Sequence, residues 1–136
     1  MTSPSLARLL TLSGALPFWL GVVLLLIGQS WAGPVALVYA ALIASFVSGI
    51  HWGLTFGPAE GQSRLLLVTS NVVTLAAWGA ALLPLRWGFA LLALLFLGLF
   101  LVERRLGPVW PEWFARLRLQ ATSLVVIALI LLALLA

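Results

Sequence analysis

Long apolar runs, separated by short segments that contain charges, prolines or glycines, make up most of this chain. A run of about 20 mostly apolar residues can cross the hydrocarbon core of a bilayer as a helix. Lipid offers no hydrogen-bond partner to backbone amides, so these runs are expected to be helices rather than open strands. The pattern predicts an all-α, polytopic membrane protein with a single transmembrane domain over residues 1–136. Its five spans are expected at residues 6–28, 34–56, 65–83, 87–102 and 111–135.

Composition supports an integral membrane protein. Hydrophobic residues make up 64% of the chain and charged residues 7%, with a mean hydropathy of +1.23, whereas about a quarter of the residues of soluble domains are charged. The net charge of +4 reflects a few loop arginines, which does not indicate a nucleic-acid partner. Without cysteine or aspartate, and with one histidine, the chain is expected to hold no metal site.

The arginines predict how the protein is oriented in the membrane. Six of the seven fall on the side of the N-terminus, and only Arg86 falls on the other. The positive-inside rule therefore places the N-terminus in the cytoplasm and the C-terminus outside. Tryptophans at both expected interfaces agree with this orientation: Trp31 and Trp87 outside, Trp110 and Trp113 inside. The arginines on the N-terminal side are Arg8, Arg64, Arg104, Arg105, Arg116 and Arg118.

The first span also resembles a signal peptide, because an apolar run follows Arg8 and leads to the small-residue segment Ser30-Trp31-Ala32. Its length and its Pro17 favour an uncleaved span instead. Pro17 lacks an amide donor, which predicts a bend and a free carbonyl at Ser13 that needs another partner.

Small residues recur at regular spacing in the first two spans, every seven residues in the first and every four in the second. Such stripes let membrane helices approach closely. We expect these helices to pack tightly through them, with space for a flat ligand as the alternative. The predicted helix-packing residues are Gly14, Gly21, Gly28, Ser45, Gly49 and Gly53.

The only histidine, His51, lies inside the second span. An ionisable side chain in a membrane span is costly and is therefore a candidate functional residue. At 1.5 Å of rise per residue, His51 and polar residues of three other spans fall at roughly the same depth, about 7 to 11 Å inside the cytoplasmic interface. This polar layer predicts a ligand site in the inner leaflet, formed by His51, Trp52, Asn71, Ser13, Ser48 and Gln120.

Several roles for His51 remain open at this point. The imidazole could hold the helices in register by bonding Asn71, Gln120 or a serine. It could instead donate to the oxygen of a quinone or lipid, with Trp52 stacking nearby. Proton transfer is a third role, and haem ligation through two histidines would need a second chain. A lipid enzyme would need an acid beside His51, for which Glu103 is the only candidate, and we expect no catalytic residue.

The half of the bundle away from the arginines is almost wholly apolar, including the fourth span and the end of the fifth. An ion pathway through one chain needs polar lining or broken helices. We therefore expect an accessory or scaffold protein, or one that binds a hydrophobic ligand such as a quinone or lipid. The alternative is an oligomeric transporter or proton conductor. Expected partners are membrane lipids, other membrane subunits or a second copy, with lipid headgroups bound by Arg104, Arg105, Arg116 and Arg118.

Short strings spread over nearly the whole chain carry a family resemblance. They are GALPF at residues 14–18, IASF at 43–46, GIHWG at 49–53 and PEWFARLR at 111–118. Together they resemble domain-of-unknown-function family 3429, the transmembrane protein 69-like small integral membrane proteins. The resemblance implies a protein of the bacterial cytoplasmic (inner) membrane, and it implies no activity.

Overall fold

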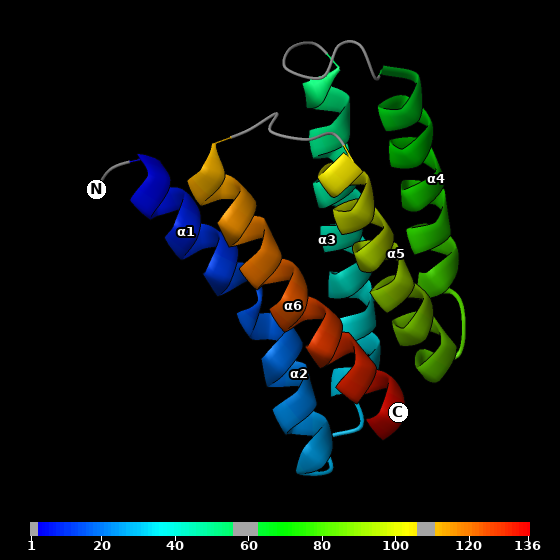
Figure 1. Ribbon diagram of the computed structural model, residues 1–136. Helices are drawn as coiled ribbons and strands as arrows, with labels where there is room; N and C mark the ends of the chain where they lie inside the picture. Colours follow the sequence, from blue (N-terminus) through cyan, green and yellow to red (C-terminus); the bar gives the residue numbers. More distant parts are fainter. Residues whose placement is uncertain (1–2, 56–62, 106–110) are drawn as a thin grey trace.

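The computed structural model describes residues 3–55, 63–105 and 111–136, which form α-helices and no strands (Figure 1). The all-α prediction is therefore confirmed. Five helical segments are long and apolar enough to cross a membrane, as predicted, and the first of them consists of two helices. The helices are α1 (Ser3–Gly14), α2 (Leu16–Leu26), α3 (Ala32–Leu54), α4 (Ser63–Ala81), α5 (Leu85–Arg105) and α6 (Glu112–Leu135).

The first span is divided at Ala15, between α1 and α2. Pro17 lies at the start of α2, where a missing amide donor is tolerated because the first amides of a helix have no partner in their own helix. The Gly14 carbonyl accepts a hydrogen bond of 2.7 Å from the hydroxyl of Tyr39 on α3. The expected bend is present, but this tertiary bond reaches the Gly14 carbonyl rather than that of Ser13. The hydrogen bond at this break therefore links the first span to α3.

The spans alternate in direction, and the two chain termini lie at opposite ends of the bundle (Figure 1). Helix α3 packs against α2, α4 and α5, while α6 packs against α2 and α5 and, more lightly, α1. The N-terminus and the starts of α4 and α6 share one end with the last turns of α3 and α5. We call this the arginine-rich end, because Arg86 alone among the arginines lies at the other end.

Close helix contacts occur at several glycines, among them Gly21 and Gly88. A Cβ atom on Gly21 would lie 3.1 Å from the Cβ atom of Ala36, so α2 and α3 approach closely here. On α5, a Cβ atom on Gly88 would lie 2.6 Å from the backbone oxygen of Ala80 and 2.9 Å from Cδ1 of Leu37. Small residues thus bring α5 into contact with both α3 and α4.

Most of the predicted small-residue stripe lies outside these contacts. No atom comes within 4 Å of a Cβ placed on Gly28, Gly49 or Gly53, and the Gly14 position meets only the Tyr39 hydroxyl, at 3.9 Å. Ser45 donates to a carbonyl of its own helix. The expected tight contact through the stripes is therefore limited to Gly21. The reason is the direction in which these residues face: after Ser45, the α3 residues that continue the four-residue spacing lie on the exposed side of the helix.

Candidate functional site

Three ionisable side chains from three helices meet inside the bundle, near its arginine-rich end. Arg118 of α6 donates to Glu103 of α5 through two bonds, Nε to Oε2 at 3.2 Å and Nη2 to Oε1 at 3.0 Å. His51 of α3 places Nε2 at 3.3 Å from Oε1 of the same carboxylate. Glu103 therefore joins the arginine to the histidine. All three residues are buried, with exposed fractions of 8% for Arg118, 5% for Glu103 and 0% for His51.

The two-bond geometry explains how these charges can lie inside the bundle. Desolvating an arginine or a carboxylate alone is expensive, and the cost is offset only by close pairing with well-aligned hydrogen bonds. A guanidinium presents parallel N–H groups that match the two oxygens of a carboxylate. Glu103 lies in the last turn of α5 and Arg118 in the second turn of α6, and these helices pack against each other. Their antiparallel packing brings the two side chains together.

The contact with Glu103 uses one nitrogen of the His51 ring. An ionised carboxylate only accepts hydrogen bonds, so Nε2 is the donor in this contact. Nδ1 is buried and has no hydrogen-bond partner among the described residues. Within the described ranges, no hydroxyl group is therefore paired with this ring.

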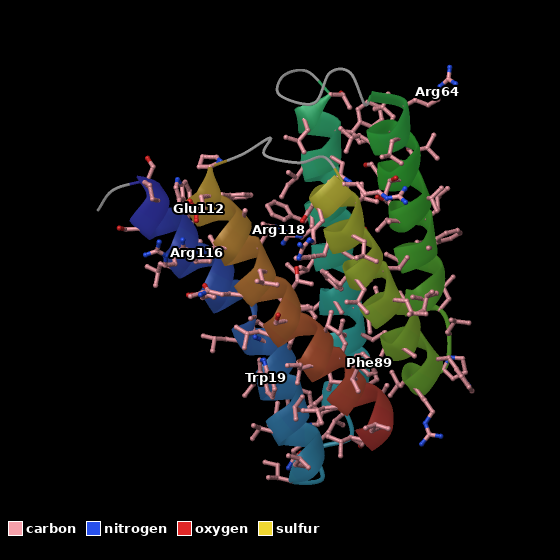
Figure 2. The ribbon with its side chains drawn as sticks, viewed as in Figure 1. Trp19, Arg64, Phe89, Glu112, Arg116 and Arg118 are labelled. Atoms are coloured by element: carbon pink, nitrogen blue, oxygen red, sulfur yellow. The ribbon has the colours of Figure 1, made fainter. Side chains whose placement is uncertain are left out.

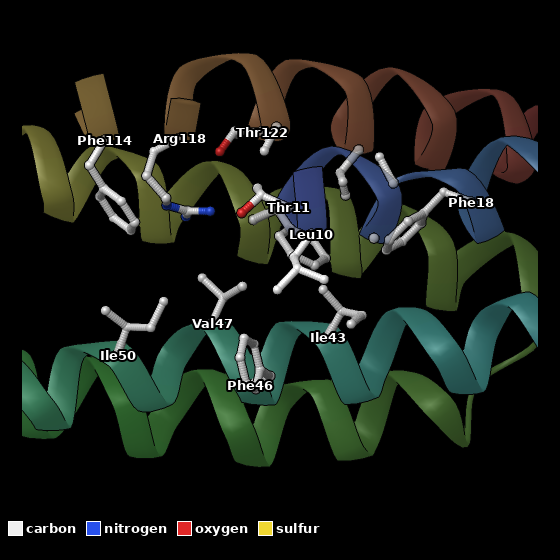
Figure 3. Close-up of a pocket in the computed structure, with 15 residues that line it drawn as sticks. Leu10, Thr11, Phe18, Ile43, Phe46, Val47, Ile50, Phe114, Arg118 and Thr122 are labelled. Atoms are coloured by element: carbon white, nitrogen blue, oxygen red, sulfur yellow. The ribbon is translucent and has the colours of Figure 1, made fainter. Parts of the chain in front are cut away.

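A cavity of about 170 Å³ lies beside this charged cluster, between α1, α2, α3 and α6 (Figure 3). Figure 3 shows the Arg118 guanidinium and the hydroxyls of Thr11 and Thr122 pointing into the same part of it. The Thr122 hydroxyl is buried and unpartnered among the described residues. The other lining residues are Leu10, Gly14, Ala15, Phe18, Ile43, Phe46, Val47, Ile50, Phe96, Phe114, Ala121 and Val125.

The cavity has an apolar rim between α1 and α3. Leu10 and Phe46 line it and are also 62% and 72% exposed on the outer surface of the bundle. Both residues belong to segments that are apolar enough to span a membrane. The rim thus faces the side of the bundle, which lipid would cover, rather than an end.

The six predicted ligand residues are not brought together. His51 and Ser48 are buried on α3, but neither lines the cavity. Ser48 shares a 2.9 Å hydrogen bond with Thr74 of α4 and also bonds the Ser45 carbonyl. The prediction rested on the depth of each residue along its span, and depth alone does not fix the direction in which a side chain points. The other four, Ser13, Trp52, Asn71 and Gln120, are exposed on the surface of the bundle.

The four predicted headgroup arginines divide into two groups. Arg104, Arg105 and Arg116 are exposed, whereas Arg118 is held inside by Glu103. Arg116 donates to Glu112 one turn earlier, at 3.1 Å. Figure 2 shows Arg116 and Arg118 on opposite sides of α6. Arg118 is therefore unavailable to a surface headgroup and belongs to the cavity instead.

Sequence reasoning missed the contribution of α6 to the cavity, although a signal was present. Phe114, Arg118, Ala121, Thr122 and Val125 follow the spacing of a single helix face. Arg118 is thus in register with the side chains that face the core, and its charge requires an internal partner. Glu103, on the preceding span, is the acid that can provide one.

Comparisons with known proteins agree with the fold and the sequence strings. Residues 3–134 match the family described as "Protein of unknown function (DUF3429)". Transmembrane protein 69 of Mus musculus is 31% identical over 96% of this chain and 56% of its own length. The Xenopus tropicalis protein of the same name is 31% identical over 94% of the chain and 53% of its length. The chain thus spans about half the length of these relatives. No solved structure matches. This chain belongs to the DUF3429 family of membrane proteins, with transmembrane protein 69 among its relatives.

Proposed function

We propose that this protein binds a lipophilic small molecule whose hydrogen-bond-accepting head occupies the cavity beside Arg118. The observation that carries the proposal is that the buried Arg118 guanidinium, the unpartnered Thr122 hydroxyl and the Thr11 hydroxyl face one part of a cavity whose other lining residues are apolar. Ligand pockets typically combine an apolar lining with a few placed polar groups. A quinone or a lipid has the required chemistry.

The size of the cavity limits what can enter it. An engineered apolar cavity of about 150 Å³ in another protein holds one benzene molecule, and this cavity measures about 170 Å³. It therefore suits a single ring or a group of similar size. The remainder of a larger ligand would leave past Leu10 and Phe46 into the surrounding lipid. This geometry favours a ring-headed molecule with a long apolar tail over a ligand that is enclosed completely.

The polar groups define the head of the ligand. Arg118 uses one Nε and one Nη2 hydrogen for Glu103, which leaves other guanidinium N–H groups as donors. Because Glu103 already balances the arginine charge, a neutral acceptor such as a carbonyl fits better than a second carboxylate. The Thr122 hydroxyl can accept or donate and would complete the polar end.

The test compares small molecules that copurify with the protein and with cavity variants. Ala121→Leu fills the cavity, and Thr122→Val removes the hydroxyl at nearly constant volume. Native mass spectrometry and solvent extraction should detect one lipophilic, oxygen-bearing species with the parent protein. We expect its occupancy to fall at least about tenfold in Ala121→Leu and by about three- to tenfold in Thr122→Val, the loss expected for one hydrogen bond of about 1 kcal/mol.

Matched controls lie on the same helix. Ala115→Leu makes the same substitution at an exposed position, and Ser123→Ala likewise removes a hydroxyl from an exposed position. Both variants should keep the occupancy of the parent. Equal occupancy in the cavity variants and their controls would overturn the proposal, as would the absence of any bound species from protein extracted under mild conditions.

We also propose that the protein resides in a bacterial cytoplasmic membrane, with its arginine-rich end in the cytoplasm. The uneven distribution of arginines supports this orientation. It would place the cavity in the inner leaflet, where a membrane-dissolved ligand reaches it from the side.

A further inference from the structure

A second hollow lies between α1 and α6, and it shares no lining residue with the cavity beside Arg118. It measures about 290 Å³ and is lined by Arg8, Trp113, Arg116, Leu117 and Gln120. We propose that this groove binds the headgroup of an anionic phospholipid. The proposal does not depend on the ligand of the inner cavity, because Arg8, Arg116 and Gln120 are exposed residues.

The charge of the groove favours a phosphate. Arg8 forms no ion pair with any residue of the described part of the chain, and it faces the groove together with Arg116. Glu112 pairs with Arg116 at 3.1 Å, but both side chains are largely exposed, with fractions of 88% and 67%. Such an exposed pair is weak and screened, so it does not remove Arg116 as a donor. The two arginines and Glu112 together leave a net charge of +1.

The groove also carries neutral donors suited to phosphate oxygens. The Gln120 amide and the Trp113 indole each supply an N–H group. Tryptophan and arginine are both favoured at the level of the lipid headgroups. Helix α6 begins at Glu112, so Trp113 and Arg116 lie in its first turns, where the helix leaves the expected membrane core.

Apolar surface continues from the groove toward the other end of the bundle. On α6, Leu124 and Ile127 follow Gln120 at helical spacing, and both are exposed. On α1 and α2, Leu12 and Leu16 follow Arg8 in the same way, with Leu16 65% exposed. A phosphate beside Arg8 and Arg116 would therefore have its acyl chains on an apolar surface. This continuous apolar surface favours a membrane phospholipid over a free anion as the ligand of the groove.

The test uses native mass spectrometry of purified protein titrated with phosphatidylglycerol or phosphatidylcholine. We expect the parent to bind phosphatidylglycerol more tightly than phosphatidylcholine. The double variant Arg8→Gln/Arg116→Gln should bind phosphatidylglycerol about tenfold more weakly, because each basic residue near a headgroup contributes about a fivefold effect and Arg116 is partly engaged by Glu112.

The control variant is Arg64→Gln/Arg105→Gln. It removes the same charge from exposed positions of the same end that do not line the groove, and it should retain nearly all phosphatidylglycerol binding. Equal loss in both double variants would show a general effect of surface charge and overturn the site. Unchanged binding in Arg8→Gln/Arg116→Gln, or equal binding of the two lipids by the parent, would overturn it as well. All four arginines are exposed, so thermal unfolding should confirm that both variants fold.

Discussion

At the scale of single residues, the burial of Arg118 depends on Glu103. A buried pair contributes little net stability compared with apolar residues of similar size, but removing one partner leaves an uncompensated charge inside the protein. The dependence is unequal. Glu103 is bonded by both Arg118 and His51, whereas Arg118 has no acid other than Glu103 as a partner among the described residues. Removing one charge should therefore cost more stability than removing both, and a double variant can test this difference.

We expect Arg118→Gln to destabilise the protein by about 3 kcal/mol or more, because it leaves the Glu103 carboxylate buried with His51 as its remaining donor among the described residues. The double variant Glu103→Gln/Arg118→Gln should recover part of this loss, since it removes both charges. Thermal or denaturant unfolding in a fixed detergent measures the difference. Arg116→Gln breaks an exposed pair and should cost under about 1 kcal/mol. A double variant less stable than Arg118→Gln would show that the pair is not the source of the effect.

Arg116 and Arg118 illustrate what the sequence could predict at this scale. Both were expected to hold headgroups, because arginines near a span end usually face the interface. The charge of a residue gives its cost of burial but not the side of the helix on which it lies. Two positions correspond to a rotation of about 200° on a helix, so these residues face opposite ways. The helical register of Arg118 with Ala121 and Val125 contained the missing information.

At the scale of helices, the contact of α5 with α3 and α4 depends on Gly88. A Cβ there would meet the backbone oxygen of Ala80, which cannot move as the end of a side chain can. We therefore expect Gly88→Ala to destabilise the protein by about 1–3 kcal/mol, the usual cost of overpacking. Unfolding measurements on purified variants provide the test.

Gly98, on the same helix, is the matched control for this change. No atom lies within 4 Å of a Cβ placed there, and alanine favours a helix over glycine by up to about 1 kcal/mol. Gly98→Ala should leave the unfolding temperature unchanged or slightly raised. If both variants were equally destabilised, the contact of Gly88 with Ala80 could not be the source of the loss.

The helix boundaries show which parts of the architecture the apolar pattern could give. Run length predicted the five spans because the bilayer sets the minimum length of a membrane helix. Pro17 predicted a disturbance in the first span, and the break at Ala15 confirms it. The hydrogen bond from Tyr39 to the Gly14 carbonyl could not be predicted, because it joins two spans and the apolar pattern does not specify their relative rotation.

At the scale of the whole molecule, the described part of the bundle has a polar half and an apolar half. The buried polar residues lie on the halves of their helices nearest the arginine-rich end, whereas the core of the other half is formed by aliphatic and aromatic side chains such as Ala40, Phe89 and Leu132. The described residues form no continuous polar path through one chain. The division agrees with a binding site reached from one leaflet rather than a pore.

The arginine distribution makes the orientation of this polar half testable. With six arginines at one end and Arg86 at the other, we expect the C-terminus to face the periplasm when the protein is expressed in a bacterial inner membrane. A fusion after Ala136 should give active alkaline phosphatase but no fluorescence from green fluorescent protein, which folds in the cytoplasm. Fusions after Arg105 should give the reverse result. A fluorescent C-terminal fusion would place the cavity in the outer leaflet, and access of the ligand from the inner leaflet would then have to be abandoned.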